Sequence, residues 1–172
     1  GGAFVVGVSV WLMMRAKTPE ADRSMYRKAT RIGAWVALVA GLGVVGTGDL
    51  QGKVMTDVQP MKMAAAEALY ETEQPADFSI FTIGSLDGQE EVFSIKVPNL
   101  LSFLAENKLD AEVVGINDLR EEYRETYGQD PGAKYYSPGD YTPIIPITYW
   151  TFRIMMGLGF VVMGASALIL WA

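Results

Sequence analysis

The sequence predicts an all-α membrane protein, with three transmembrane helices of a larger helical bundle and an extracytoplasmic loop that holds short helices and a β-hairpin. Half of the 172 residues are hydrophobic, and they collect in three blocks separated by the charged residues. The blocks cover residues 1–14, 32–47 and 144–172. A helix that crosses the hydrocarbon needs about 20 mostly apolar residues. This block distribution, rather than the composition itself, argues against a soluble domain.

The first block is too short to cross a bilayer, because residues 1–14 extend about 21 Å as a helix. A signal peptide places its positive charges before the apolar run, but here Arg15 and Lys17 follow it. The alternative is a helix cut by the start of the chain, and the last block likewise ends without a polar flank. We therefore expect truncated transmembrane helices at residues 1–15 and 148–172.

The segments between the blocks differ in charge. Residues 15–31 carry six basic and two acidic residues, whereas residues 48–147 carry seven basic and 18 acidic residues. Because short cytoplasmic loops are enriched in Lys and Arg, residues 16–31 are predicted to be a basic cytoplasmic link, followed by a transmembrane helix at residues 32–48. Residues 49–147 then form the extracytoplasmic loop. Aromatic residues at the block boundaries suit the two membrane interfaces: Trp11, Tyr141, Tyr149 and Trp150.

The loop is predicted to begin by breaking the second membrane helix. Gly46, Gly48 and Gly52 supply the break, and Thr56-Asp57 can cap a new helix that tolerates Pro60 in its first turn. Met61–Thr72 then contains strong helix formers.

The rest of the loop combines a hairpin with short helices. Phe and Ile alternate with Ser and Thr over Phe78–Ile83, which predicts a strand, and Val92–Val97 is its expected partner. The other expected elements are a turn at Gly84–Gly88, helices at Leu100–Ala105 and Asn117–Tyr127, and a Gly- and Pro-rich linker over Gly128–Pro146.

The first candidate site lies where the second membrane helix ends, at the depth where a lipid-soluble substrate, such as a quinol, would present its polar head. Oxidation of a quinol needs partners for both ring oxygens and a base that accepts a proton. Lys62 can donate to a ring oxygen, and Glu67 can accept a proton if burial raises its pKa. Their positions differ by five residues, which places the two side chains about 140° apart around an ideal helix. The alternative is a solvated Lys and Glu on a surface helix.

The second candidate site is Phe152-Arg153-Ile154-Met155-Met156. An ionisable residue inside an apolar run needs an anionic partner, which a haem propionate would supply to Arg153; the alternative is snorkelling to the interface. A Met thioether can be an axial haem ligand, but it can also simply pack. Periodicity does not separate Met155 from Met156. The chain has no His and no Cys, so a nitrogen ligand must come from elsewhere.

At these two places the chain resembles the large subunit (subunit I) of cytochrome bd-type quinol oxidases, over a fragment from the fifth to the seventh membrane helix. The resemblance rests on residues 48–52, on the Gln-Pro-x-Lys-x-Ala-Ala-x-Glu block within residues 57–72, on the Phe-Arg-Ile-Met run at 152–155 and on the opening residues 2–7. The loop after Glu73 is short, which indicates the short-loop type.

The resemblance implies roles for individual residues. Lys62 and Glu67 would be the quinol-site residues, Met155 an axial ligand of the low-spin haem b iron, and Arg153 a neighbour of that haem or of the quinol. The opposite haem ligand is expected upstream of Gly1, and the ligands of high-spin haem b and haem d on helices outside this chain.

The resemblance also implies a quinol:oxygen oxidoreductase of the bacterial plasma membrane. Ubiquinol or menaquinol would be oxidised at the loop, protons would be released outside, and oxygen would be reduced to water, which generates a proton gradient. A second large subunit, a small accessory subunit and the lipid bilayer are the expected partners, and nucleic acid is not. The alternatives from other classes are a transporter or channel segment and a membrane-anchored extracytoplasmic binding module.

Overall fold

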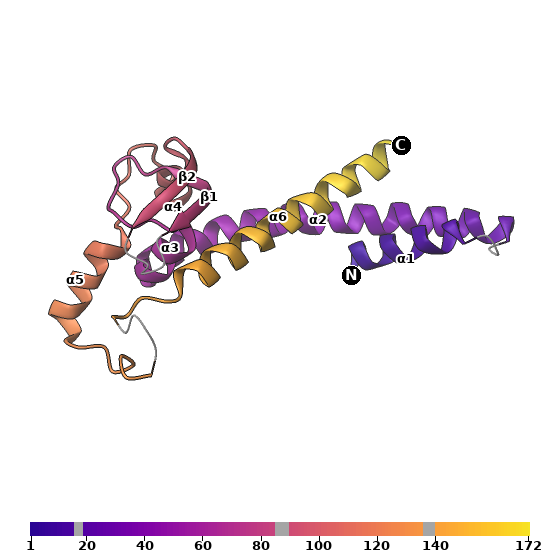
Figure 1. The fold of residues 1–172 in the computed structure, drawn as a ribbon. Helices are drawn as coiled ribbons and strands as arrows, with labels where there is room; N and C mark the ends of the chain where they lie inside the picture. Colours follow the sequence, from indigo (N-terminus) through magenta and orange to yellow (C-terminus); the bar gives the residue numbers. More distant parts are fainter. Residues whose placement is uncertain (16–18, 85–89, 136–139) are drawn as a thin grey trace. The chain divides into compact units, whose positions relative to one another are not determined.

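The computed structural model describes residues 1–15, 19–84, 90–135 and 140–172 (Figure 1). It is mostly helical and contains one small antiparallel sheet. The chain divides into two compact units, residues 1–47 with 155–172, and residues 48–154. The predicted turn at Gly84–Gly88 lies largely outside the described residues.

The first unit consists of membrane-type helices. It contains α1 (Gly2–Met14) with the first part of α2 (Glu20–Val58) and the last part of α6 (Ile145–Trp171). Within it α1 and α2 approach closely, because a Cβ on Gly2 would lie 2.7 Å from the carbonyl oxygen of Gly33. Small residues permit this kind of backbone approach between apolar helices.

Among the described residues, α2 and α6 are long and apolar enough to cross a membrane. Helix α1 has 13 residues, about 20 Å in length, so the predicted count of three transmembrane helices is not confirmed. The expected mostly helical chain is confirmed, although the sheet makes "all-α" too narrow a description.

The prediction that glycines end the second membrane helix is wrong, because α2 continues to Val58. Glycine costs only about 1 kcal/mol in a helix interior, and it does not block the geometry. Lys53 pairs with Asp49 one turn away, and the Thr56 hydroxyl donates to the Gly52 carbonyl oxygen, so Thr56 does not cap a new helix. The helix ends just before Pro60, since proline disfavours the helical conformation of the preceding residue.

Helix α3 (Pro60–Glu67) ends earlier than the predicted Thr72, because Ala68 adopts a left-handed conformation with φ 51°. The backbone then pairs with another element instead of continuing the helix. The carbonyl oxygens of Leu69 and Tyr70 accept bonds of 2.9 and 3.0 Å from the N–H groups of Ile116 and Asn117. Tertiary pairing therefore overrides helix propensity here.

The remaining elements of the second unit agree with the sequence predictions. The strands are β1 (Phe78–Gly84) and β2 (Glu91–Val97), and they pair antiparallel as the expected hairpin. The helices are α4 (Leu100–Glu106) and α5 (Ile116–Tyr127).

The core of the second unit surrounds α3. One cluster joins Met61, Ala64 and Ala65 of α3 to residues of α5 and α6, and a second joins Met63 to residues of α4 and the following segment. The run Ala64–Ala66 lets neighbouring elements approach α3 from both sides, and it leaves Glu67 inside the packed region.

Candidate functional site

The centre of the second unit is an ion pair between α3 and α6. One guanidinium nitrogen of Arg153 (Nη2) lies 2.5 Å from Glu67 Oε2, and the other (Nη1) lies 3.3 Å from Oε1. The Glu67 side chain is 3% exposed and the Arg153 side chain 8%. A bidentate Arg–carboxylate pair of this kind fixes geometry as well as charge.

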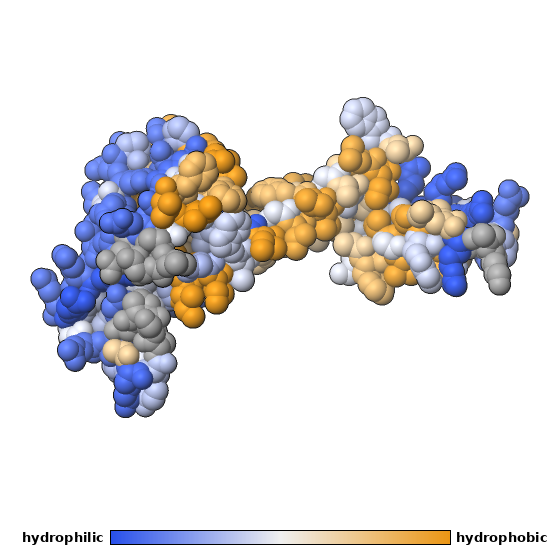
Figure 2. Space-filling view, viewed as in Figure 1, coloured by the Kyte–Doolittle hydropathy of each residue, from blue (hydrophilic) through white to orange (hydrophobic). Residues whose placement is uncertain are grey.

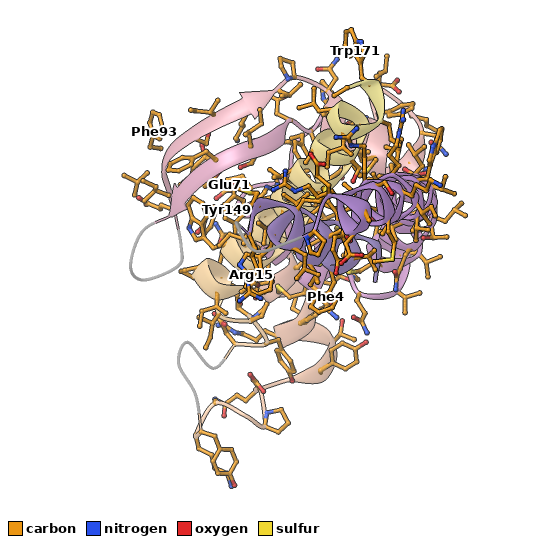
Figure 3. The ribbon with its side chains drawn as sticks, turned by 90° about the vertical axis from the view of Figure 1, so that its right-hand side faces the viewer. Phe4, Arg15, Glu71, Phe93, Tyr149 and Trp171 are labelled. Carbon is orange, nitrogen blue, oxygen red and sulfur yellow. The ribbon has the colours of Figure 1, made fainter. Side chains whose placement is uncertain are left out.

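The hairpin and α6 complete the surroundings of Arg153. Its Nε donates to the carbonyl oxygen of Ser79 at 2.8 Å. The guanidinium carbon lies 4.5 Å from the ring centre of Phe78 and 4.8 Å from that of Tyr149, which are cation–π distances. Tyr149 also shares a hydrogen bond of 2.8 Å with the Ser79 hydroxyl, and it lies beside the hairpin in Figure 3. Strand β1 therefore holds Arg153 in place against Glu67.

Burial raises the pKa of Glu67, although the hydrogen bond and positive charge of Arg153 act in the opposite direction. Desolvation is the largest of these effects, because burial penalises the charged carboxylate. Strongly perturbed carboxyl groups with a specific charged partner are frequent at functional sites.

Lys62 lies in a different environment on the same helix. It is exposed, and it lines an open cavity of about 530 Å³ formed by the end of α2, by α3, by α5 and by the segment that leads into α6. Tyr123 and Tyr141 line the same cavity. Burial, with a contribution from the Glu122 carboxylate, raises the pKa of Tyr123, so its phenol stays neutral.

The far wall of this cavity is fixed by polar bonds. Arg120 of α5 pairs with Asp140 at 2.9 Å and donates to the Thr142 hydroxyl at 2.9 Å. Thr142 is 1% exposed, and it lines the cavity beside Tyr141. The part of the lining formed by Thr142 is therefore held by polar contacts with α5.

The structure brings Glu67 and Arg153 together, but Lys62 lines a cavity that neither of them lines. This separation agrees with the angle of about 140° between positions 62 and 67 on a helix. The anionic partner that Arg153 requires is Glu67, whereas the sequence suggested a haem propionate.

The two methionines differ in exposure. Met155 is 60% exposed, whereas Met156 is half-buried. The Met155 sulfur is thus available to a group bound from outside the chain, and a thioether suits an axial position on haem iron.

Sequence reasoning missed several residues around these groups. Ser79 contributes through its backbone carbonyl, which leaves no signal in a strand pattern. Tyr149 was expected only as an interfacial aromatic, and Tyr123 and Tyr141 carried no signal that linked them to Lys62.

Comparisons with known proteins agree over the whole chain. Residues 1–172 match the family model for cytochrome bd terminal oxidase subunit I. The chain is 35% identical to a cytochrome bd ubiquinol oxidase subunit 1 of Bacillus subtilis (strain 168), over 99% of this chain and 34% of that protein. It is 31% identical to a cytochrome bd-II ubiquinol oxidase subunit 1 of Escherichia coli (strain K12), over 71% of this chain and 23% of that protein.

The fold agrees with the same assignment. The bd oxidase structure from Geobacillus thermodenitrificans matches with a TM-score of 0.74 and 26% identity, over 98% of this chain and 34% of that chain. The matches thus cover between about a quarter and a third of the length of these relatives. The transporter and binding-module alternatives find no support in these matches. The chain belongs to the cytochrome bd terminal oxidase subunit I family, whose members are membrane proteins.

Proposed function

We propose that this chain forms the quinol-oxidising part of a bd-type terminal oxidase, a complex that passes electrons from a membrane quinol to oxygen. Membership of the family supports this function. The observation that carries it is the buried Glu67–Arg153 pair. This pair joins the loop helix α3 to α6, the helix that carries Met155 two residues further on.

In this proposal Glu67 is the proton acceptor. Its burial keeps it in a site from which water is largely excluded, and it raises the pKa of the carboxyl group. A general base works best when its pKa approaches the working pH. Before the transfer, Arg153 holds the deprotonated carboxylate of Glu67 in a fixed orientation. When Glu67 takes a proton, it loses its charge, and the ion pair with Arg153 weakens.

Lys62 is proposed to bind the polar head of the quinol. Its ammonium group can donate to a ring oxygen, and the cavity beside it is of the size and mixed character usual for small-molecule sites. The neutral phenol of Tyr123 can act as a second donor. Ubiquinol and menaquinol present the same two oxygens to these groups.

Met155 is proposed to ligate the iron of low-spin haem b, with the opposite ligand outside this chain. The haem supplies one-electron redox chemistry when it is bound. High-spin haem b and haem d, and the reduction of oxygen, are proposed to belong to the rest of the subunit.

The loop 49–147 is proposed to lie on the extracytoplasmic side, between transmembrane helices at 32–48 and 148–172. The basic residues in the short segment 16–31 support this orientation, because short cytoplasmic loops are enriched in Lys and Arg. Protons that leave Glu67 would then be released outside. A second large subunit and a small accessory subunit complete the proposed complex.

The test of this function is the replacement of Glu67 by glutamine in the intact oxidase. The amide keeps the size of the side chain and cannot accept the proton, so we expect kcat for quinol oxidation to fall by about 100-fold or more. The reduced-minus-oxidised haem spectrum should stay unchanged. Glu121→Gln on exposed α5 is the matched control, because it makes the same chemical change outside the site.

The pH profile of the wild-type oxidase, compared with that of Glu67→Gln, gives a second measurement. Only the deprotonated Glu67 accepts a proton, so activity should rise with pH through its pKa, which burial places above the ordinary value of 4.5. Glu67 faces Arg153 as its charged partner, and Arg153 in turn contacts the Tyr149 ring and the Ser79 carbonyl oxygen. If Glu67→Gln keeps wild-type activity and the same acidic limb, Glu67 is not the acceptor.

Lys62→Ala is expected to act on substrate binding instead. Loss of one donor to a quinol oxygen should raise KM about tenfold, since a hydrogen bond to a charged group contributes roughly 1.5–3 kcal/mol. The measurement is quinol titration of the intact oxidase, with Lys108→Ala, an exposed lysine paired with Glu106, as the control. A fall in kcat with unchanged KM would contradict a role in binding.

A further inference from the structure

In a sheet with one face in water, the buried face is usually apolar and the exposed face polar. In the β1–β2 hairpin this arrangement is reversed. Ser79 and Thr82 point inward and are 3% and 2% exposed. Their hydroxyl groups bond to each other, and Ser79 also bonds to Tyr149. The cross-strand partners on this face are Lys96 and Ser94, which are polar as well. The inner face is therefore polar and its hydrogen bonds are made within the protein.

The other face is apolar and largely uncovered. The cross-strand pairs Phe81–Ile95 and Ile83–Phe93 alternate with the polar pairs. Ile95 and Phe93 are 52% and 53% exposed. Figure 2 shows hydrophobic side chains gathered on this part of the molecule, and in Figure 3 Phe93 lies on the side of the hairpin away from Tyr149. The exposed apolar side chains of the hairpin are Ile80, Ile83, Val92, Phe93 and Ile95.

Contacts with Trp150 and Arg153 fix the position of the hairpin along α6. Phe81 makes an edge-to-face contact with Trp150, with ring centres 5.1 Å apart. The Ser79 carbonyl oxygen accepts the bond from Arg153. Beyond Arg153 the helix has no charged residue through Trp171. The hairpin is thus held beside Tyr149 and Trp150, residue types that are enriched where helices enter the hydrocarbon.

We propose that the apolar face of the hairpin, formed by Ile80, Ile83, Phe93 and Ile95, inserts into the outer interfacial region of the bilayer and is covered by lipid acyl chains. The inference rests on α6 crossing the membrane, and it does not depend on quinol oxidation. Acyl chains need no hydrogen bonds from the surface that they cover, and this face offers apolar side chains alone. Protein interfaces, in contrast, surround their apolar centre with polar contacts.

The geometry limits how deep the hairpin lies. The sheet has two strands, so each strand has one edge whose backbone N–H and C=O groups are not bonded to the other strand. Such groups are not tolerated in contact with the hydrocarbon core. The side chains therefore enter the acyl region while the backbone stays at the level of the head groups.

The test is the depth of a spin label at position 93. Phe93→Cys would be labelled in the intact oxidase, in an otherwise cysteine-free background, and reconstituted in vesicles of phosphatidylcholine and phosphatidylglycerol. Power saturation then compares accessibility to oxygen, which concentrates in lipid, with accessibility to a water-soluble nickel chelate. Glu121→Cys, exposed on α5, is the aqueous control.

We expect the label at 93 to show at least fivefold lower access to the nickel chelate than the label at 121, together with higher access to oxygen. Ile95→Cys repeats the measurement on the same face, at a position that is 52% exposed. Access to nickel equal to the control would mean that the face is in water, and exclusion of both reagents would mean that a protein covers it. Either result overturns the proposal, and neither bears on Glu67, because the measurement uses no quinol.

Discussion

Replacing Met155 by leucine is expected to remove the low-spin haem b signal from the reduced-minus-oxidised spectrum of the intact oxidase, or to shift it strongly. Leucine has a similar volume and the same apolar character, so the apolar helix α6 should form unchanged. It has no sulfur, and the axial position on the iron would lose its proposed ligand. Quinol oxidation should fall by about 100-fold or more, because electrons leave the quinol through this haem in the proposed function.

Met156→Leu is the matched control, because it makes the same change one residue further along the same helix. The half-buried Met156 is expected to leave the spectrum unchanged. If the signal is lost in Met156→Leu and kept in Met155→Leu, the ligand is Met156. If both variants keep the signal, the ligand does not lie in this run.

Replacing Arg153 by methionine is expected to open the loop around α3 and β1. The substitution leaves the Glu67 carboxyl group buried without its positive partner, which is one of the most destabilising changes known for buried pairs. Glu67 can escape the penalty by taking a proton, and this protonation costs about 1.4 kcal/mol for each pH unit above its ordinary pKa. With an ordinary value of 4.5, the cost reaches about 3 kcal/mol at pH 7.

The sign of the pH dependence follows from the direction of the pKa shift. The pKa of Glu67 is raised in the folded state, and more so without Arg153. The variant should therefore be close to wild-type stability below pH 4.5 and lose stability as the pH rises through the folded pKa. At pH 7 we expect about 100-fold faster hydrogen exchange in peptides that cover α3 and β1, with little change at pH 5.

A double variant separates the buried charge from the lost packing. Glu67→Met combined with Arg153→Met removes both charges, and it should restore much of the exchange protection that Arg153→Met loses. Equal exchange in the single and double variants at all pH values would mean that Arg153 stabilises the loop only by packing on Phe78 and Tyr149.

Elements with strong local signals could be predicted from the sequence. The alternating pattern at Phe78–Ile83 predicted β1, since period two is the direct consequence of strand geometry. The transmembrane helix predicted at residues 148–172 corresponds to α6, which begins three residues earlier at Ile145. The charged stretch at Asn117–Tyr127 predicted α5 to within one residue.

Other features depended on tertiary contacts, and local patterns could not predict them. The end of α3 at Ala68 depends on backbone bonds from α5, which comes nearly fifty residues later. Glu67 and Arg153 were both identified as candidate site residues, but nothing in their spacing joined them, because their positions differ by 86 residues. The predicted end of the second membrane helix near residue 48 was wrong, because glycines permit a break in a helix and do not require one.

The position of α3 between two packed clusters has a consequence for how the site tolerates change. Because Ala64 and Ala65 face one cluster and Met63 the other, the thickness of a single slender helix sets the spacing between the Lys62 cavity and the Arg153 contact. A longer side chain in the alanine run would push these neighbours apart and alter both places at once.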